Sequence, residues 1–196
     1  MKFTGERVVP NDMHDRPDIY SEHLIRYAIA MNYCGNMEIL DVACGTGYGT
    51  KILNSVGKAW GGDNDLESIK YAQETYGLEN LQVIDLETQT ILSVFNQKFD
   101  VIVSFETIEH LVNPKYFLKN VREALSEDGL FILSVPVQNR SPFHKHLYNY
   151  RQATEVGNGD FQNIRIFVQR ADMLLPEIMA AGDFNTRGTY IIKMMS

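Results

Sequence analysis

The chain has few cysteines and no long hydrophobic run. Cys34 and Cys44 are its only cysteines, too few for a disulfide framework, so we expect two reduced thiols. No apolar run approaches the roughly 20 residues that cross a bilayer, and residues 1–7 lack the apolar centre of a secretory signal. These absences argue against a disulfide-rich secreted protein or a helical membrane protein. They predict a cytoplasmic protein with no membrane partner.

Basic residues are in the minority. The chain has 18 lysines and arginines against 25 aspartates and glutamates, which gives a net charge of −7 at pH 7. Because phosphate contacts dominate binding to duplex nucleic acid, this balance makes a nucleic-acid partner unlikely on charge grounds. The last third still gathers basic residues, which we interpret as a solvated surface: Arg140, Lys145, Arg151, Arg165, Arg170 and Arg187.

Strand and helix patterns alternate through the middle of the chain. Strands are expected at residues 38–42, 58–62, 81–84, 99–105 and 130–135. Helices are expected between them at residues 48–56, 66–76 and 114–126. The segment 99–105 is apolar and β-branched without alternation, as in a parallel strand covered on both faces. This alternation predicts a doubly wound α/β fold with helices on both faces of the sheet.

Turn and capping residues set the expected helix boundaries. Ser21 should cap a helix that runs to about Asn32, after a loop over residues 1–18. Gly77 should end one helix, and Asn113 with Pro114 should begin another.

The C-terminal part completes the predicted sheet. A short helix is expected at residues 148–155 and a sixth strand at 163–169. The segment 171–181 has helical composition, and a seventh strand at 189–194 should return antiparallel beside the sixth. The fold class is therefore a mostly parallel, seven-stranded sheet whose last strand is antiparallel.

A glycine-rich loop follows the first strand. It runs Asp41-Val42-Ala43-Cys44-Gly45-Thr46-Gly47 and leads into a helix, an arrangement that binds nucleotide-like ligands. Dinucleotide sites favour G-x-G-x-x-G, but Thr50 occupies the position of the third glycine. The Asp41 carboxylate would repel a pyrophosphate and attract an ammonium or a sulfonium. S-adenosylmethionine carries both cations.

Two further strand ends are acidic. Asp63 follows the second strand and is suited to accept both hydroxyls of a ribose. Asp85 follows the third, where its carboxylate is suited to accept the adenine amine while Leu86 packs on the ring. Because ligands bind at the carboxyl ends of parallel strands, we expect these residues at one site. The set suits a ligand with an ammonium, a ribose and an aminopurine.

Residues 38–136 resemble the class I methyltransferases, which have a Rossmann-like fold and convert S-adenosyl-L-methionine to S-adenosyl-L-homocysteine. The resemblance places the glycine-rich loop at the methionine end of the cofactor, Asp63 at the ribose, Asp85 at the adenine and Phe105 over the methionine portion. The cofactor-binding residues it implies are Asp41, Ala43, Cys44, Gly45, Thr46, Gly47, Asp63, Asn64, Asp85, Leu86 and Phe105.

Four shorter segments narrow the resemblance. They are Phe-Thr-Gly-Glu-Arg-Val-Val-Pro at 3–10, Glu-His-Leu-Ile-Arg-Tyr at 22–27, Ser-Phe-Glu-Thr-Ile-Glu-His-Leu at 104–111, and Ser-Pro-Phe-His at 141–144. Together they are similar to small bacterial and phage methyltransferases linked to surface polysaccharide or secondary metabolism.

The chain has no internal repeat, low-complexity tract or Pro/Gly/Ser-rich linker, so we expect one methyltransferase domain over 1–196. An N-terminal extension and helix occupy 1–35, a cofactor-binding core 36–136, and a C-terminal segment on the substrate side 137–196.

Three residues after the fourth strand are the candidates for catalysis. If the acceptor is a hydroxyl, a base must take its proton, and His110 is suited to this with Glu106 or Glu109 tuning it. The same E-x-x-E-H group resembles that of quinone-biosynthesis O-methyltransferases, where it can hold a divalent cation, but we expect no metal here. His144, Lys145 and His146 are expected on the same side of the sheet, and His23 with Arg26 is expected on a lid helix.

The sequence predicts a methyltransferase that acts on an oxygen or nitrogen of a sugar or secondary metabolite. Alternatives are a cofactor-binding sensor or pseudoenzyme, and a methyltransferase that acts on protein or nucleic acid. Nucleic-acid amino-methyltransferases would carry an N/D-P-P-Y/F tetrad where this chain has Ser104-Phe105-Glu106-Thr107. A cytosine-C5 enzyme would need a Pro-Cys pair there. The sequence leaves the acceptor and the oligomeric state open.

Overall fold

The computed structural model describes residues 8–13, 16–137, 141–170, 173–176 and 189–196. The strands are β1 (Glu38–Val42), β2 (Lys58–Asp63), β3 (Leu81–Val83), β4 (Phe99–Phe105), β5 (Leu125–Pro136), β6 (Gln162–Arg170), β7 (Met173–Pro176) and β8 (Thr189–Met195). The α-helices are α1 (Pro17–Met31), α2 (Tyr48–Leu53), α3 (Leu66–Tyr76), α4 (Ile91–Phe95), α5 (Pro114–Ala124) and α6 (Tyr150–Glu155). Two 3-10 helices are η1 (Pro10–Asp12) and η2 (Ile108–His110).

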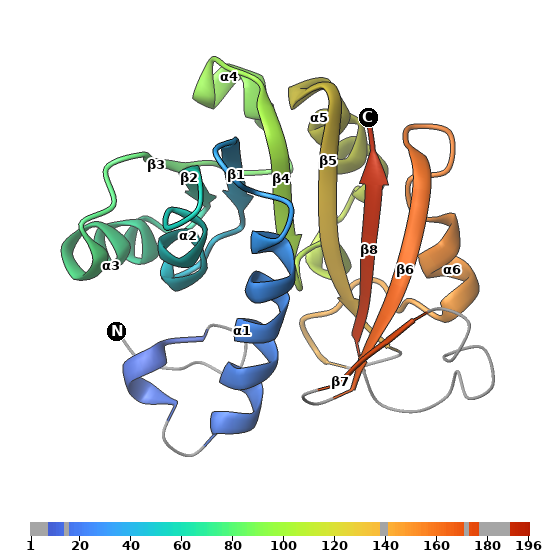
Figure 1. Ribbon diagram of the computed structural model, residues 1–196, viewed down its shortest axis with the longest axis horizontal. Helices are drawn as coiled ribbons and strands as arrows, with labels where there is room; N and C mark the ends of the chain where they lie inside the picture. The colour runs from blue at the N-terminus through green and yellow to red at the C-terminus, as the bar shows by residue number, and fades with distance from the viewer. Residues whose placement is uncertain (1–7, 14–15, 138–140, 171–172, 177–188) are drawn as a thin grey trace.

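The strands form one sheet in the order β3-β2-β1-β4-β5-β8-β6-β7 (Figure 1). The pairs from β3 to β5 are parallel, whereas β8 runs antiparallel to both β5 and β6. The predicted doubly wound, mostly parallel sheet with an antiparallel last strand is confirmed. The order reverses between β1 and β4, and this is where such sheets bind ligands.

The sheet has one strand more than the seven predicted. Met173–Pro176 forms β7, which pairs antiparallel with β6, so the helix expected at 171–181 is wrong for these residues. The other residues of that predicted helix lie outside the described residues. Backbone pairing with an adjacent strand has overridden helical composition, which is a weak determinant of structure.

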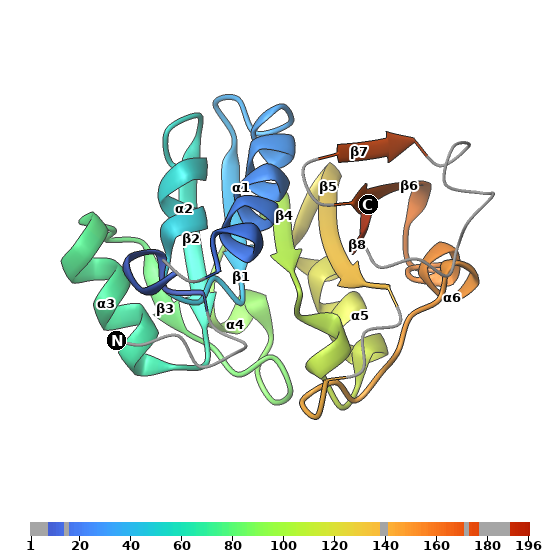
Figure 2. The ribbon, with the colours of Figure 1, turned by 90° about the horizontal axis from the view of Figure 1, so that it is seen from below.

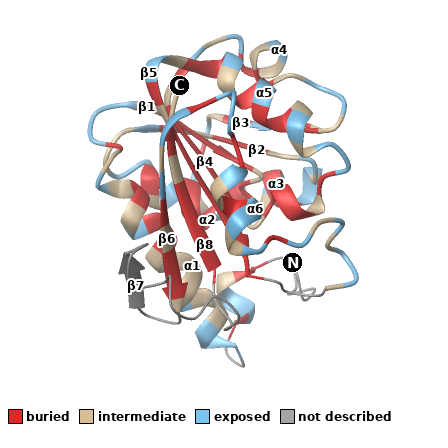
Figure 3. Cartoon of the chain, turned by 90° about the vertical axis from the view of Figure 1, so that its right-hand side faces the viewer, coloured by how far each residue is buried: buried red, intermediate tan, exposed pale blue. Residues whose placement is uncertain are grey.

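Helices cover both faces of the sheet (Figure 2). Tyr27 and Ala30 of α1 and Leu53 of α2 pack on one face, and Phe117 and Val121 of α5 pack on the other. Figure 3 shows the central strands buried along most of their length. Successive residues of the inner strands point to opposite faces, so both hydrophobic layers come from the same apolar runs.

Several helix boundaries follow local chemistry. Gly77 ends α3 with φ of 65°, and the Asn113 side chain caps α5 by accepting from the Tyr116 amide at 3.1 Å, as predicted. The predicted cap at Ser21 is wrong, because α1 begins earlier with Pro17 at its first position. Proline is favoured there, since its fixed φ suits a helix and its missing N–H has no partner to lose.

The chain enters β5 earlier than expected. Leu125 already pairs with Phe99, so α5 ends at Ala124 rather than near residue 126. The register shifts before the pairing of Val101 with Leu130, and Asp128 has φ of 60° in this irregular stretch.

Both cysteines are buried and neither forms a disulfide. Among the described residues, no helix combines the length and hydropathy needed to span a membrane.

Candidate functional site

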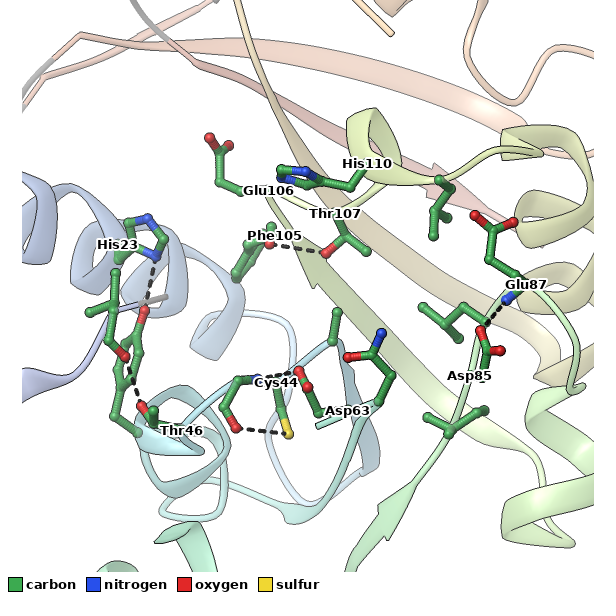
Figure 4. A pocket seen from close by; sticks show the side chains of 18 of the residues that line it. His23, Cys44, Thr46, Asp63, Asp85, Glu87, Phe105, Glu106, Thr107 and His110 are labelled. Carbon is green, nitrogen blue, oxygen red and sulfur yellow. Dashed lines mark hydrogen bonds between the residues drawn. The ribbon is translucent and has the colours of Figure 1, made fainter. Parts of the chain in front are cut away.

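A cavity of about 450 Å³ lies at the carboxyl ends of β1, β2, β3 and β4. Figure 4 shows its wall, with His23 and Thr46 on one side, Asp85 and Glu87 on the other, and Cys44 with Asp63 between them. Most of the predicted cofactor-binding residues line it: Ala43, Cys44, Gly45, Thr46, Asp63, Asn64, Asp85, Leu86 and Phe105. The fold therefore brings together residues that the sequence places at separate strand ends.

The glycine-rich loop leaves open space at its tip. Gly45 has φ of +54°, and no heavy atom lies within 4 Å of the place where a Cβ would stand. Ala43, directly after β1, also has a positive φ, of 61°. A left-handed alanine is strained, and such strain concentrates at functional sites. A ligand can therefore approach this backbone closely.

Backbone amides orient the Asp63 carboxylate. Its Oδ2 accepts from the Gly45 amide at 2.8 Å and its Oδ1 accepts from the Asp65 amide at 3.0 Å. A carboxylate oxygen accepts more than one hydrogen bond, so both oxygens retain capacity for ligand hydroxyls. The second strand end is thus fixed relative to the loop that follows the first.

Asp85 is held in a similar way at the far side of the cavity. Its carboxylate accepts from the Glu87 amide and from the Thr88 hydroxyl, each at 2.9 Å. Glu87 lies at the mouth, where its Oε1 is 3.8 Å from the Lys145 ammonium and accepts from the Val112 amide. The carboxylates of Asp85 and Glu87 therefore make this end of the cavity acidic, and the Lys145 ammonium lies opposite Glu87.

Asp41 lies behind the cavity wall rather than at it. Its carboxylate is 1% exposed and accepts from the Tyr27 hydroxyl at 3.2 and 3.3 Å and from the Thr50 hydroxyl at 2.7 Å. Burial raises the pKa of Asp41 to about 7, and the nearby Asp63 adds to this, while the hydrogen bonds from Thr50 and Tyr27 oppose it. Asp41 does not itself line the cavity, but it contacts Tyr27, which does.

Gly47 and Glu109 also lie outside the lining. Gly47 has φ of +77°, and a Cβ there would collide with Ala72, so this glycine serves the turn into α2 and the packing of α3. Glu109 is 1% exposed, and its backbone carbonyl accepts from the amides of Lys145 and His146 at 2.8 and 3.1 Å. It anchors the loop that follows β5.

Glu106 and His110 stand at the rim, next to each other in Figure 4. Glu106 has φ of 51°, and its Oε1 accepts from the Ser134 hydroxyl at 2.8 Å. Nδ1 of His110 lies 3.1 Å from the Phe143 carbonyl. Since a carbonyl only accepts, Nδ1 donates to it, and the other ring nitrogen, Nε2, lies 3.9 Å from the Glu109 carboxylate. Two of the three predicted catalytic side chains, Glu106 and His110, thus reach the cavity with defined orientations.

The E-x-x-E-H residues do not gather into one ligand set. Glu106 faces Arg26 and Ser134, whereas donor atoms of Glu109, His110 and His144 lie within 4.8 Å of one another. Carboxylate oxygen and imidazole nitrogen are donors that divalent transition metals bind. These three residues are the ones that could hold such an ion among the described side chains.

Helix α1 supplies two lining residues, His23 and Tyr27. His23 was expected only as part of a lid, and Tyr27 was missed, although their spacing places both on one face of a helix. Arg26 does not reach the cavity; it is buried and bonded to Gln169 and Thr189. Other lining residues that the sequence did not single out are Val8, Tyr48, Ile84, Glu87, Thr107 and Leu111.

His23 is neutral in this setting. Its Nδ1 lies 2.9 Å from the Tyr48 hydroxyl, and burial, together with the charge of Arg26, lowers the pKa of His23 to about 3. Burial raises the pKa of the Tyr48 phenol, so that group stays protonated.

Sequence comparisons agree with this architecture. A family model described as a methyltransferase domain matches residues 35–170. The chain is 26% identical over 168 residues to a probable S-adenosylmethionine-dependent methyltransferase of Mycolicibacterium smegmatis, covering 80% of this chain and 63% of that protein. It is 33% identical over 133 residues to a mitochondrial ubiquinone biosynthesis O-methyltransferase of Dictyostelium discoideum, covering 61% and 41%. The chain therefore spans less than two thirds of either relative.

Solved structures share the fold. A S-adenosylmethionine-dependent methyltransferase from Clostridium acetobutylicum superposes with a TM-score of 0.66 at 19% identity, over 94% of this chain and 96% of that one. The N-methyltransferase NodS from Bradyrhizobium japonicum, in complex with S-adenosyl-L-homocysteine, gives 0.70 at 13% identity, over 94% and 90%.

Proposed function

Because the chain belongs to the methyltransferase domain family, we propose that it binds S-adenosyl-L-methionine in this cavity and methylates an oxygen or nitrogen of a small molecule. The observation that carries the proposal is the alignment of Gly45, Asp63 and Asp85 along one cavity. An open glycine turn, a carboxylate suited to a ribose and a carboxylate suited to an adenine amine follow in the order of the cofactor's parts.

The cofactor contacts we assign follow the same order. The loop from Ala43 to Thr46 and Phe105 surround the methionine portion, Asp63 with Asn64 binds the ribose, and Asp85 with Leu86 binds the adenine. Asp41 and Gly47 act indirectly, the first through Tyr27 and the second through the turn.

The acceptor enters at the rim, beside Glu106 and His110. If the acceptor is a hydroxyl, its oxygen would take the methyl group of the bound S-adenosyl-L-methionine, with a C–O bond forming as the C–S bond breaks and that electron pair staying on sulfur. His110 takes the hydroxyl proton at Nε2, because Nδ1 already carries a hydrogen. A neutral amine acceptor would attack in the same way and lose a proton afterwards. The protein's main work is alignment and exclusion of water.

We take the acceptor to be a sugar or secondary metabolite. The cavity is a concave site of a size that suits small molecules, and the net charge of −7 disfavours nucleic acid. The relatives named above comprise an O-methyltransferase and an N-methyltransferase, which supports either acceptor atom.

Ligand-induced thermal stabilisation tests the cofactor assignment. S-adenosyl-L-homocysteine should raise the melting temperature in a concentration-dependent way, because it binds only the folded state. NADH at the same concentrations should not. Stabilisation by NADH alone would replace the methyltransferase assignment with a dinucleotide site.

Release of S-adenosyl-L-homocysteine in the presence of candidate acceptors separates catalysis from mere binding. We expect release with a hydroxyl acceptor from a panel of sugars and phenols, and a loss of about a hundredfold or more in His110→Ala, as for removal of a general base. His146→Ala is the matched control, since His146 does not line the cavity. A protein that binds the cofactor but releases no product with any acceptor in a broad panel would be a sensor or pseudoenzyme.

A further inference from the structure

The cavity continues past the ribose and loop positions to helix α1. Figure 4 places Asp85 at one end, Asp63 near the middle, and His23 with Thr46 at the other end. A cofactor with its adenine at Asp85 and its ribose at Asp63 must direct its amino-acid group toward this last end. This inference rests on the proposed function.

Nε2 of His23 is the ring nitrogen that has no hydrogen-bond partner among the described residues. The other nitrogen, Nδ1, lies 2.9 Å from the Tyr48 hydroxyl, a group that can donate or accept. When the hydroxyl donates to Nδ1, the neutral imidazole carries its hydrogen on Nε2. In this tautomer the Nε2 N–H is available to a ligand.

The strongest carboxylates of the cavity lie away from His23. Asp63 is near the middle and Asp85 at the far end (Figure 4). On the His23 side the Arg26 guanidinium is paired with Glu106 at 3.5 Å and with Glu22 at 3.9 Å, so those two carboxylates face a cation. An α-carboxylate is therefore repelled less at the His23 end than beside Asp63 or Asp85.

We propose that Nε2 of His23 donates a hydrogen bond to the α-carboxylate of the bound cofactor. Helix α1 then recognises the amino-acid group, while the strand ends recognise the nucleoside. His23 becomes a residue that selects ligands carrying the carboxylate over those that lack it.

The test compares two ligands that differ by one group. S-adenosyl-L-methionine and decarboxylated S-adenosyl-L-methionine share the nucleoside, the sulfonium and the ammonium, and only the first has the carboxylate. Calorimetric titration of the full chain, without acceptor, gives both dissociation constants. A hydrogen bond to a charged group predicts that the wild type prefers the carboxylated ligand by about tenfold to a hundredfold.

Variants of His23 and Tyr48 test whether His23 causes this preference for the carboxylated ligand. His23→Ala should weaken binding of the carboxylated ligand and leave the decarboxylated one nearly unchanged, so that the preference collapses. His23→Gln places an amide N–H near the position of Nε2 and should restore part of the preference. Tyr48→Phe removes the hydroxyl that donates to Nδ1 in this tautomer and should lower the preference by a smaller factor. His146→Gln is the matched control and should change neither constant.

Distinct results would overturn the idea. Equal weakening of both ligands in His23→Ala would mean that α1 acts only through packing, and an unchanged preference would mean that His23 does not touch the carboxylate. If the wild type binds neither ligand, the proposed function fails as well. If His23→Ala does not fold, the comparison of His23→Gln and Tyr48→Phe with the wild type decides.

Discussion

The guanidinium of Arg26 lies 3.5 Å from the carboxylate of Glu106, which joins the middle of α1 to the residue directly after β4. The arginine side chain is 3% exposed and the glutamate side chain 23%. Arg26 also donates to Gln169 at 2.8 Å and to Thr189 at 3.0 Å. One buried cation therefore ties the helix that covers the cavity to the rim and to strands β6 and β8.

Breaking this pair should be costly. Arg26→Ala leaves the Glu106 carboxylate and two polar side chains without their cation, and removal of one partner of a buried pair costs about 3–5 kcal/mol. A double-mutant cycle with Glu106→Gln, measured by urea denaturation, should give a coupling energy of about 1–3 kcal/mol. The exposed pair Arg151–Glu155 is shorter, at 2.9 Å, yet its cycle should give a much smaller coupling energy, because solvent screens both charges. Equal coupling in the two cycles would contradict the role given to burial.

Asp63→Ala should abolish stabilisation by S-adenosyl-L-homocysteine. The change removes the carboxylate that we assign to the ribose and releases the Gly45 and Asp65 amides. Loss of two charge-assisted hydrogen bonds corresponds to about a hundredfold or more in affinity.

Asp100→Ala is its matched control. Asp100 lies near the start of β4 and accepts from the Glu38 amide at 3.0 Å and the Ser126 hydroxyl at 2.9 Å. The Asp100→Ala variant should lose about as much folding stability as Asp63→Ala and keep the wild-type affinity for S-adenosyl-L-homocysteine. If Asp63→Ala kept the wild-type affinity for S-adenosyl-L-homocysteine, the assignment of Asp63 to the ribose would be wrong.

Asp41 should make folding stability depend on pH. Its pKa is raised from 3.8 to about 7, so the folded state holds this proton more tightly than the unfolded state. The associated stability is complete below about pH 4 and is lost as the pH rises through about 7. At about 1.36 kcal/mol per pKa unit the full change is roughly 4 kcal/mol.

Urea denaturation between pH 4 and pH 8 measures this effect as the difference between wild type and Asp41→Asn. The wild type should lose stability relative to the variant across that range, because the amide does not ionise. A constant difference would show that Asp41 does not titrate in this window.

Gly49→Ala should disturb the cavity through Tyr27. A Cβ at Gly49 would collide with the Tyr27 ring, and Tyr27 lines the cavity. Overpacking of this kind costs about 1–3 kcal/mol, and affinity for S-adenosyl-L-homocysteine should fall as the ring moves. Gly35→Ala is the control, because no heavy atom lies within 4 Å of its added Cβ. A fully stable Gly49→Ala with unchanged affinity would show that the ring yields freely.

Local patterns in the sequence determined the fold class and predicted that the residues we assign to the nucleoside would lie at one cavity. The alternation of apolar strands with helices predicted the parallel sheet, and Gly45, Asp63 and Asp85 each lie at the end of a strand or within three residues of it. Since parallel strands end at one edge of a sheet, the position of each residue in its own element was enough to bring them together. The prediction that these residues share one site required no information about the direction of their side chains.

Only the tertiary structure decided which way the remaining side chains point. Asp41 sits in the glycine-rich motif, yet its carboxylate faces Tyr27 and Thr50. His110 lies beside Glu109 in the sequence, yet its orientation depends on Phe143, 33 residues away. Helix α1 is held by Arg26 through Gln169, 143 residues away. Such contacts form when packing brings distant elements together, so no local pattern encodes them.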